Sequence, residues 1–523
     1  MQRDDYRATG IVMFGLAAAT LTGFLRQAAI AHQLGAGRAT DVYLVAFAVP
    51  EFVFIALPII LAPAFIPLFA DCRLRMGEAR AWRFGLRVAG VLLATLLLFT
   101  ACAGLGAPLY VRWLAPGFGP SERAQAVLAT RRMLPAISLM GVTTLTGVVL
   151  QVYRRFARPV LAAAVYNLTF IAALLALPLA RPLDRAAWGV TLGAVAALMF
   201  QLPLLWSQHP RRPGSTQQRR LGPHEATQPL PRSPRVSQAA RLAGPLAAGY
   251  AIHHVILFVD RAMATTLGAG SAAALNFSYH LALAVGQMSG LAVSTALFPH
   301  LAEQIAKGNT AGARASLSNA LRFVWTVGLP AACGLILLRT PVVRVLFERG
   351  AFGQAATATV SAPLVWYALA VLADALCQPL WRVVYAAGLH QSGRSAWTVL
   401  AVNGLQTGVR LLGNLILLPL FGTNGLALSA ALGLSVQAVV LGWLVRRWLG
   451  TYLTHAWWRD ATRVLLATAA TAGAISLWIA QPFGKLRPPL YAAPALATLL
   501  VGGTLGSLTY LLVLRVLQER HET

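Results

Sequence analysis

Acidic residues are scarce in this 523-residue chain, which has 16 Asp and Glu against 43 Lys and Arg and a formal net charge of +27. Charged residues of both signs make up only 11% of the sequence, about half of what a soluble globular protein carries. This shortage excludes an ordinary soluble domain. With 57% hydrophobic residues and a mean hydropathy of +0.65, the composition predicts a membrane protein.

Cysteine and catalytic motifs are equally sparse. The four cysteines are widely spaced, form no CxxC pair or zinc pattern, and are interpreted as small core residues: Cys72, Cys102, Cys333 and Cys377. The Gly484-Lys485 pair is no P-loop, because Ile479 occupies the position of the first glycine. Paired carboxylates and nucleophile-base spacings are also lacking. We therefore expect no enzyme, no metal site and no cofactor.

Long apolar runs, by contrast, fill the chain. A membrane-spanning helix needs roughly 20 mostly apolar residues, and about fourteen such stretches follow one another, which predicts an all-α integral membrane protein. The expected spans are 10–33, 40–70, 86–112, 127–153, 158–180, 186–207, 238–262, 272–304, 317–339, 358–388, 395–420, 424–446, 461–481 and 490–515.

Arginines are concentrated in alternate loops, at 73–87, at 154–158 and in the Pro-rich segment 209–237. Because cytoplasmic loops hold the excess of Lys and Arg, both termini are predicted to be cytoplasmic. Most of the positive charge then sets topology. Nucleic-acid binding is excluded, since the basic residues are spread over many short loops without interleaved aromatics. The 209–237 segment is interpreted as a solvated linker or as a contact for anionic lipid head groups.

An internal duplication is visible at an offset of about 232 residues. Leu34–Gly37 recurs as Leu267–Gly270, and Val152-Tyr153 recurs as Val384-Tyr385. Each copy holds six spans, an even number, so the two repeats are parallel and a substrate site is expected between them near the midplane. The predicted domains are a six-helix lobe at 1–208, the basic cytoplasmic linker 209–237, a second six-helix lobe at 238–448, and two added helices at 449–523.

Three motifs carry a family resemblance: Gly23-Phe24-Leu25-Arg26, the run from Leu34 to Asp41, and Val343–Phe352. Together they resemble the lipid II flippases of the MurJ/MviN family, over nearly the whole chain. The resemblance implies a multidrug/oligosaccharidyl-lipid/polysaccharide exporter of the bacterial inner membrane. Such proteins move a polyprenyl-pyrophosphate-linked saccharide, the peptidoglycan precursor lipid II, from the inner to the outer leaflet by alternating access.

The same resemblance implies a cationic cavity for the pyrophosphate, a lipid-tail groove along residues 449–523, and membrane lipids and cell-wall synthesis proteins as partners. Sodium, protons or the membrane potential would drive transport. Several arginines typical of the family are replaced, at Thr20, within Pro50–Ile55 and at Tyr279-His280. Two alternatives therefore stay open: a flippase for another polyprenyl-linked oligosaccharide, or a non-transporting scaffold of envelope synthesis.

Four intramembrane polar residues are candidates for substrate binding: Arg26, Asp41, Glu51 and His280. Arg26 suits bidentate contact with pyrophosphate, or else pairs with Asp41 or Glu51. Asp41 alternatively serves the N-terminal dipole of its helix. Glu51 is a candidate proton acceptor or the partner of Arg26. His280 would add a pH-dependent charge, or would pack through a hydrogen bond.

A second set, Asp260, Arg410 and Asn414, resembles the family's cation site. Arg410 precedes Asn414 by one helical turn, so both side chains share a face. We expect the Arg410 guanidinium to occupy the cation position and neutralise Asp260. The alternative is a local pair between Asp260 and Arg261.

Overall fold

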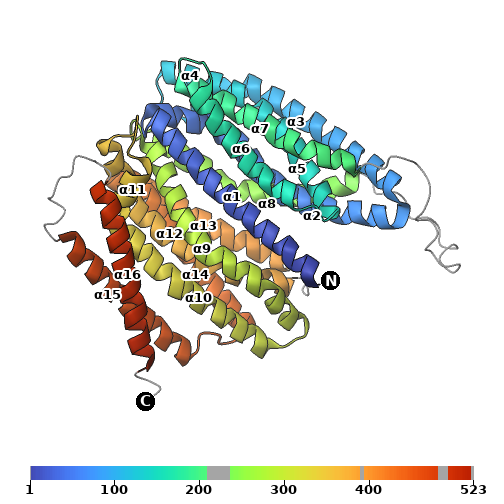
Figure 1. Ribbon diagram of the computed structural model, residues 1–523. Coiled ribbons are helices and arrows are strands. Elements are labelled where there is room, and N and C mark those ends of the chain that lie inside the picture. The colour runs from blue at the N-terminus through green and yellow to red at the C-terminus, as the bar shows by residue number, and fades with distance from the viewer. Residues whose placement is uncertain (1, 209–235, 389–393, 481–492, 520–523) are drawn as a thin grey trace. The chain divides into compact units, whose positions relative to one another are not determined.

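The computed structural model describes residues 2–208, 236–388, 394–480 and 493–519, and every regular element within these ranges is a helix (Figure 1). This confirms the predicted all-α fold class. Nearly all of the basic segment 209–237 lies outside the described residues, so its contact with lipid head groups stays a prediction.

The chain divides into two compact units, of which the first holds Met1–Leu34 and Ala39–Thr266. Its helices are α1 (Gln2–Leu34), α2 (Arg38–Met76), α3 (Glu78–Leu114), α4 (Pro120–Met133), α5 (Pro135–Val152), α6 (Ala157–Ala176), α7 (Pro182–Ser207) and α8 (Val236–Thr265). Phenylalanines of α2 and α3 stack at its core, with ring centroids of Phe65 and Phe84 5.7 Å apart. Burial of such rings packs α2, α3 and α5 against one another.

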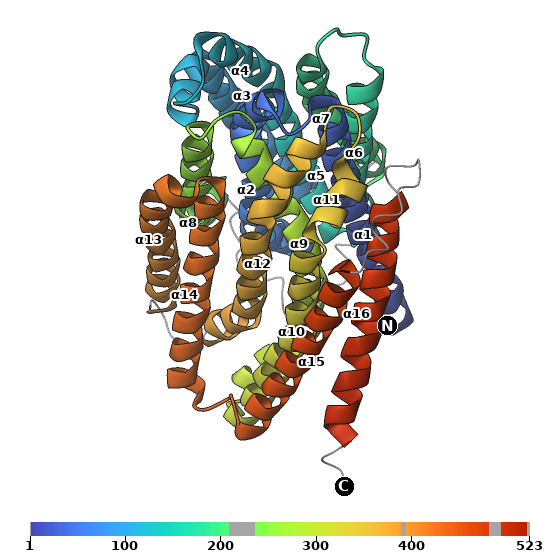
Figure 2. The same cartoon turned by 90° about the vertical axis from the view of Figure 1, so that its left-hand side faces the viewer.

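The second unit holds Gly35–Arg38 and Leu267–Thr523. Its helices are α9 (Ser271–Ala306), α10 (Thr310–Leu337), α11 (Arg339–Phe347), α12 (Gln354–Gly388), α13 (Arg394–Phe421), α14 (Thr423–Leu449), α15 (His455–Ala480) and α16 (Ala493–Glu519). The last two helices lie side by side, and α15 packs along α10 (Figure 2). An ion pair between Arg322 and Asp460, 3.0 Å long, joins α10 to α15, and the Tyr510 hydroxyl of α16 donates to the Thr326 carbonyl at 2.7 Å.

The sixteen helices of the described residues are consistent with the fourteen predicted spans. Twelve segments of the described residues are long and apolar enough to cross a membrane, and one of them joins α4 and α5 into Pro120–Val152. The long helices α8 and α9 correspond to the two predicted spans that are not among these twelve. Helix α11 has only nine residues and is too short to cross a membrane. The break between α4 and α5 falls at Leu134, directly before Pro135, whose ring cannot continue a helix without losing a hydrogen bond.

The duplication is visible in the helices themselves. Helix α9 begins 233 residues after α2, and α10 begins 232 residues after α3. Corresponding helices pack in corresponding pairs: α6 on α7 and α13 on α14, α5 on α7 and α12 on α14, α3 on α5 and α10 on α12. The compact units follow contacts rather than sequence repeats, because α8 groups with the first unit. The lobe boundaries at 208, 238 and 448 stay a prediction.

Helix α2 carries four prolines, Pro50, Pro58, Pro63 and Pro67, without being interrupted. Each removes a backbone donor, so the carbonyl four residues earlier receives no helical hydrogen bond from it. Neighbouring helices and polar side chains can satisfy such carbonyls inside a membrane protein. Backbone carbonyls near Pro50 are therefore candidates to accept hydrogen bonds from polar side chains of other helices.

Candidate functional site

The way α1 packs against α6 determines where the Arg26 side chain lies. Asn167 of α6 donates at 3.3 Å to the hydroxyl of Thr22, one turn before Arg26, and at 3.4 Å to the carbonyl of Ala19, two turns before it. Asn167 is 7% exposed, and a buried amide in a membrane bundle must find such partners. This contact sets α1 against α6 so that the guanidinium of Arg26 lies among the aromatic residues of α2 and α6.

Three rings surround the Arg26 guanidinium in the first unit. Its Cζ lies 5.8 Å from the ring centroid of Phe47, 5.7 Å from that of Tyr166 and 5.7 Å from that of Phe170. Tyr43 closes the group, stacked on Phe47 at 5.7 Å and edge-on to Phe170 at 6.2 Å. We call these five residues the Arg26 cage. The negative ring faces stabilise a cation where little water is available to do so.

Hydrogen-bond donors in the Arg26 cage lack acceptors. The Nε of Arg26 and the hydroxyl oxygens of Tyr43 and Tyr166 are buried and make no hydrogen bond within the described part of the chain. Buried polar atoms are normally satisfied, and an unsatisfied group is costly. The Nε of Arg26 and two tyrosine hydroxyls thus have no hydrogen-bond partner among the described residues, a donor set that would suit an anion with several oxygen atoms.

A second cation reaches α2 from α8. The Nη2 of Arg261 lies 2.9 Å from the Glu51 carboxylate, and its Nη1 donates to the Leu44 carbonyl at 2.9 Å. The two charged side chains are 17% and 28% exposed, respectively. Glu51 thus has a cationic partner that the sequence analysis did not consider, one that attaches α8 to α2 just beside Pro50.

Aromatic contacts continue this attachment along α8. Phe52 of α2 packs against Tyr250, His254 and Phe258, with centroid distances of 5.3, 6.4 and 5.5 Å. His254 stacks on Tyr250 at 3.8 Å, and its Nδ1 lies 3.0 Å from the Tyr250 carbonyl oxygen. These contacts hold Arg261, which lies farther along the same helix, opposite Glu51.

The remaining candidates are placed as follows. Asp41 is fully buried in the first turn of α2, where a carboxylate also suits the helix dipole. Asp260 is buried on α8 in the first unit. His280 lies on α9 in the second unit, next to Tyr279, and Arg410 and Asn414 lie on α13, also in the second unit. A joint site of Asp260 with Arg410, and a role for His280 beside Arg26, stay predictions.

Sequence reasoning missed the aromatic members of the Arg26 cage. Tyr43 and Phe47 are four residues apart on α2, as are Tyr166 and Phe170 on α6. Residues at this spacing share one helix face. The cage could therefore have been found from the sequence by looking for aromatic pairs at a spacing of four residues in helices close to an intramembrane arginine.

Comparison with known proteins agrees with the motifs. The family model described as lipid II flippase MurJ matches residues 30–486. The lipid II flippase MurJ of Burkholderia cenocepacia is 27% identical over 490 residues, covering 92% of each chain. The probable lipid II flippase MurJ of Rhizobium tropici is 30% identical over 480 residues, covering 89% of this chain and 85% of the relative.

Solved structures show the same fold. A lipid II flippase MurJ in an inward closed conformation superposes with a TM-score of 0.78 at 16% identity, covering 98% of this chain and 99% of that one. An inward-facing multidrug resistance MATE family transporter of the MOP superfamily gives a TM-score of 0.67 at 14% identity, over 83% of this chain and 95% of that one. The family match over most of the chain confirms the resemblance seen in the sequence, and the chain belongs to the lipid II flippase MurJ family.

Proposed function

We propose that this protein moves lipid II, the undecaprenyl-pyrophosphate-linked peptidoglycan precursor, from the inner to the outer leaflet of the bacterial inner membrane by alternating access. Membership of the MurJ family and a fold shared with MOP-superfamily transporters support this function. Transport of this kind makes and breaks no covalent bond, so the protein acts as a carrier and not as an enzyme.

The observation that carries the proposal is the set of unsatisfied donors in the Arg26 cage. A charged arginine inside a membrane is costly unless it meets an anion or a cavity. A guanidinium presents its N–H groups in a planar fork that fits two oxygen atoms of one phosphate. The hydroxyls of Tyr43 and Tyr166 add two neutral donors. Pyrophosphate, with several oxygen acceptors and a negative charge, matches this donor set.

Arg261 gives the site a second cation whose charge is held by Glu51. We assign Glu51 the role of masking Arg261 until substrate arrives, and Asp41 the role of fixing the N-terminal end of α2. His280 adds charge from the second unit as the pH falls. In the cation site, Arg410 with Asn414 replaces a mobile ion at Asp260, so transport is expected to be independent of sodium.

The lipid and the membrane complete the assignment. Both termini face the cytoplasm, as the arginine-rich loops predict. The undecaprenyl tail follows the outer surface of α15 and α16, where Leu466, Leu477, Leu508 and Leu512 are each more than half exposed. The membrane potential assists movement of the charged head group, since one charge moved across 100 mV changes the free energy by about 2.3 kcal/mol.

The test is complementation of bacterial cells depleted of their own lipid II flippase. We expect the wild-type chain to restore growth, Arg26→Ala to fail, and Arg26→Lys to fail or restore weakly, because an ammonium lacks the planar fork. The matched control is Arg75→Ala, which removes an exposed arginine at the end of α2. All variants must reach the membrane in equal amounts.

Two outcomes would contradict the proposal. Restoration by Arg26→Ala would remove the pyrophosphate contact and would favour a scaffold, especially if the basic segment 209–237 proved essential. Failure of the wild-type chain, combined with rescue of cells that lack a flippase for another polyprenyl-linked oligosaccharide, would replace lipid II as the substrate.

A further inference from the structure

The second unit holds a partly buried carboxylate that no role above uses. Asp374 lies on α12, three residues from the midpoint of the helix. At a rise of 1.5 Å per residue, it is displaced from the midpoint by about 4–5 Å along the helix axis. The apolar segment around it, Gln354–Tyr385, is long enough to cross a membrane, so Asp374 belongs near its centre. An ionisable residue at this depth is rare and points to function.

No cation compensates Asp374. Its hydrogen-bond donor is the Gln378 side chain, whose Nε2 lies 3.4 and 3.5 Å from the two carboxylate oxygens. No ion pair joins Asp374 to any side chain that the structure describes. An isolated carboxylate that is neither paired nor well hydrated binds a proton instead of keeping its charge.

The described charged groups on the helices packed against α12 make no contact with Asp374. Their described titratable and charged groups are Tyr279, His280 and Glu303 of α9, Arg314, Arg322 and Cys333 of α10, Arg339 and Arg344 of α11, Arg410 of α13, and Arg446 and Arg447 of α14. None of these forms a hydrogen bond or ion pair with Asp374. On its own helix the other titratable or charged groups are Tyr367, Cys377, Arg382 and Tyr385, of which the buried thiol of Cys377 lies one turn away. The protonation of Asp374 therefore depends on solvent access and on its burial.

A metal cation does not fit this position. Sodium or another hard cation needs several oxygen ligands, and the one polar side chain that contacts Asp374 presents its amide N–H. No group of three His, Cys, Asp or Glu residues with metal-ligand geometry occurs in the described ranges.

Polar side chains follow Asp374 toward the C-terminal end of the helix. Gln378 and Arg382 follow at successive intervals of four residues, and the 49%-exposed Tyr385 continues the same face. A proton from water can thus reach the carboxylate from the C-terminal end of α12.

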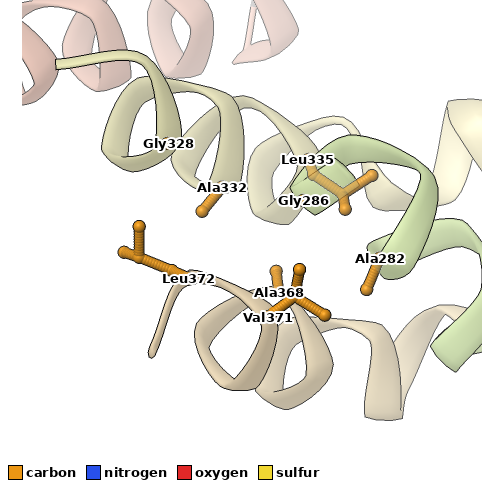
Figure 3. Close-up of a pocket in the computed structure, with 8 residues that line it drawn as sticks. All are labelled: Ala282, Gly286, Gly328, Ala332, Leu335, Ala368, Val371 and Leu372. Atoms are coloured by element: carbon orange, nitrogen blue, oxygen red, sulfur yellow. The ribbon is translucent and has the colours of Figure 1, made fainter. Parts of the chain in front are cut away.

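Asp374 also lies one turn from a close contact between α12 and α9. A Cβ on Gly286 of α9 would be 1.8 Å from Val371 Cγ1 of α12. Small residues of α9, α10 and α12 line a narrow apolar pocket there, including Gly286, Gly328 and Ala332 (Figure 3). Helices that meet through small residues approach closely, so their backbones pack directly against each other. A change of charge one turn away biases which packing is stable.

We propose that Asp374 is a proton-binding site: a proton from water adds to one carboxylate oxygen and later returns to water. The resulting change of charge shifts the packing of α12 against α9 and α10. Coupling of this step to transport rests on the proposed lipid II function, whereas proton binding itself does not.

The direct test is pH-difference infrared spectroscopy of the full-length protein in lipid nanodiscs. We expect the carbonyl-stretch band of a protonated carboxylic acid that titrates with pH. The band should be lost in Asp374→Asn and kept in Asp71→Asn, which removes an exposed carboxylate. In Gln378→Leu the band should remain but move to higher frequency, because the acid loses a hydrogen-bond donor; this variant serves if Asp374→Asn does not fold.

Several results would overturn the proposal. These are a titrating band that persists in Asp374→Asn, the absence of any titrating band, an unmoved band in Gln378→Leu, or a band abolished by replacing potassium with sodium at fixed pH. In proteoliposomes, lipid II transport by the wild type should depend on a pH gradient, and Asp374→Asn should lose that dependence. If the band behaves as expected but the wild type moves no lipid II, the proposed function fails and the proton site stands.

Discussion

Removal of Arg261 should destabilise the first unit, because it leaves the carboxylate of Glu51 without its cationic partner. In Arg261→Leu, the Glu51 carboxylate loses its cationic partner at 2.9 Å and the Leu44 carbonyl loses its donor at 2.9 Å. Leucine fills much of the same volume, so the change reports on the lost polar contacts. The side chains are 17% and 28% exposed, which leaves the stranded carboxylate with little water.

The magnitude follows from these two contacts. Breaking a fully buried ion pair by removing one partner costs about 3–5 kcal/mol, and an exposed pair contributes about 0–1 kcal/mol. The partial exposure of Glu51 places Arg261→Leu near the lower end of the buried range, at about 3 kcal/mol. Glu51→Gln keeps the Arg261 bond to the Leu44 carbonyl and an acceptor oxygen, so its expected cost is about 1 kcal/mol. The double variant Glu51→Leu/Arg261→Leu strands no charge and should recover about 1–2 kcal/mol relative to the sum of its single variants.

The assay is a double-mutant cycle on purified protein in detergent, with the free energy of unfolding taken from titration with a denaturing detergent. The matched control is Arg75→Leu, which breaks the exposed pair with Asp71 on the same helix α2 and should cost less than about 1 kcal/mol. The reasoning is refuted if Arg261→Leu costs no more than Arg75→Leu, or if the cycle gives a coupling energy indistinguishable from zero.

Two glycine substitutions test the close helix contacts. Gly286→Ala would drive a methyl group into Val371 Cγ1 at 1.8 Å, and we expect a loss of about 1–3 kcal/mol. Gly334→Ala on α10 meets nothing within 4 Å and should not lose stability, so equal unfolding curves for these two variants would contradict the contact. Gly425→Ala would meet the Leu417 carbonyl oxygen at 2.2 Å, where only the backbone could move, so a loss of about 3 kcal/mol in the same unfolding titration is expected. Wild-type stability would argue against this turn between α13 and α14.

The fold was largely predictable because membrane spans are encoded locally. An apolar run of sufficient length must be a helix inside a bilayer, since nothing else satisfies its backbone. The internal duplication further predicted which helices of the first repeat correspond to which helices of the second. Sequence could not show that the segment expected at 127–153 begins at Pro120 and breaks at Leu134, because amphipathic extensions and helix breaks depend on packing. The short α11 was missed as a helix for the same reason.

The candidate site was predictable only where a residue is exceptional in its surroundings. Arg26 was found because an arginine within an apolar span is rare. Its cage was not found, since Phe47 and Phe170 look like ordinary core residues in an apolar run. Arg261 was considered only as an alternative partner of its neighbour Asp260, although adjacent residues on a helix do not face each other. Its partner Glu51 lies 210 residues away in the sequence.

The two arginines differ in what an arriving anion must displace. Arg261 already holds a carboxylate, so a phosphate oxygen can bind it only by breaking a short ion pair. Arg26 has no ion pair within the described residues and is stabilised by ring faces, each of which contributes about 0.5–2 kcal/mol without occupying the N–H groups. An anion can therefore bind Arg26 edge-on while the rings stay in place. On the proposed function, Arg26 is expected to be the first contact for the pyrophosphate, and Arg261 to become available only after Glu51 has been neutralised or moved.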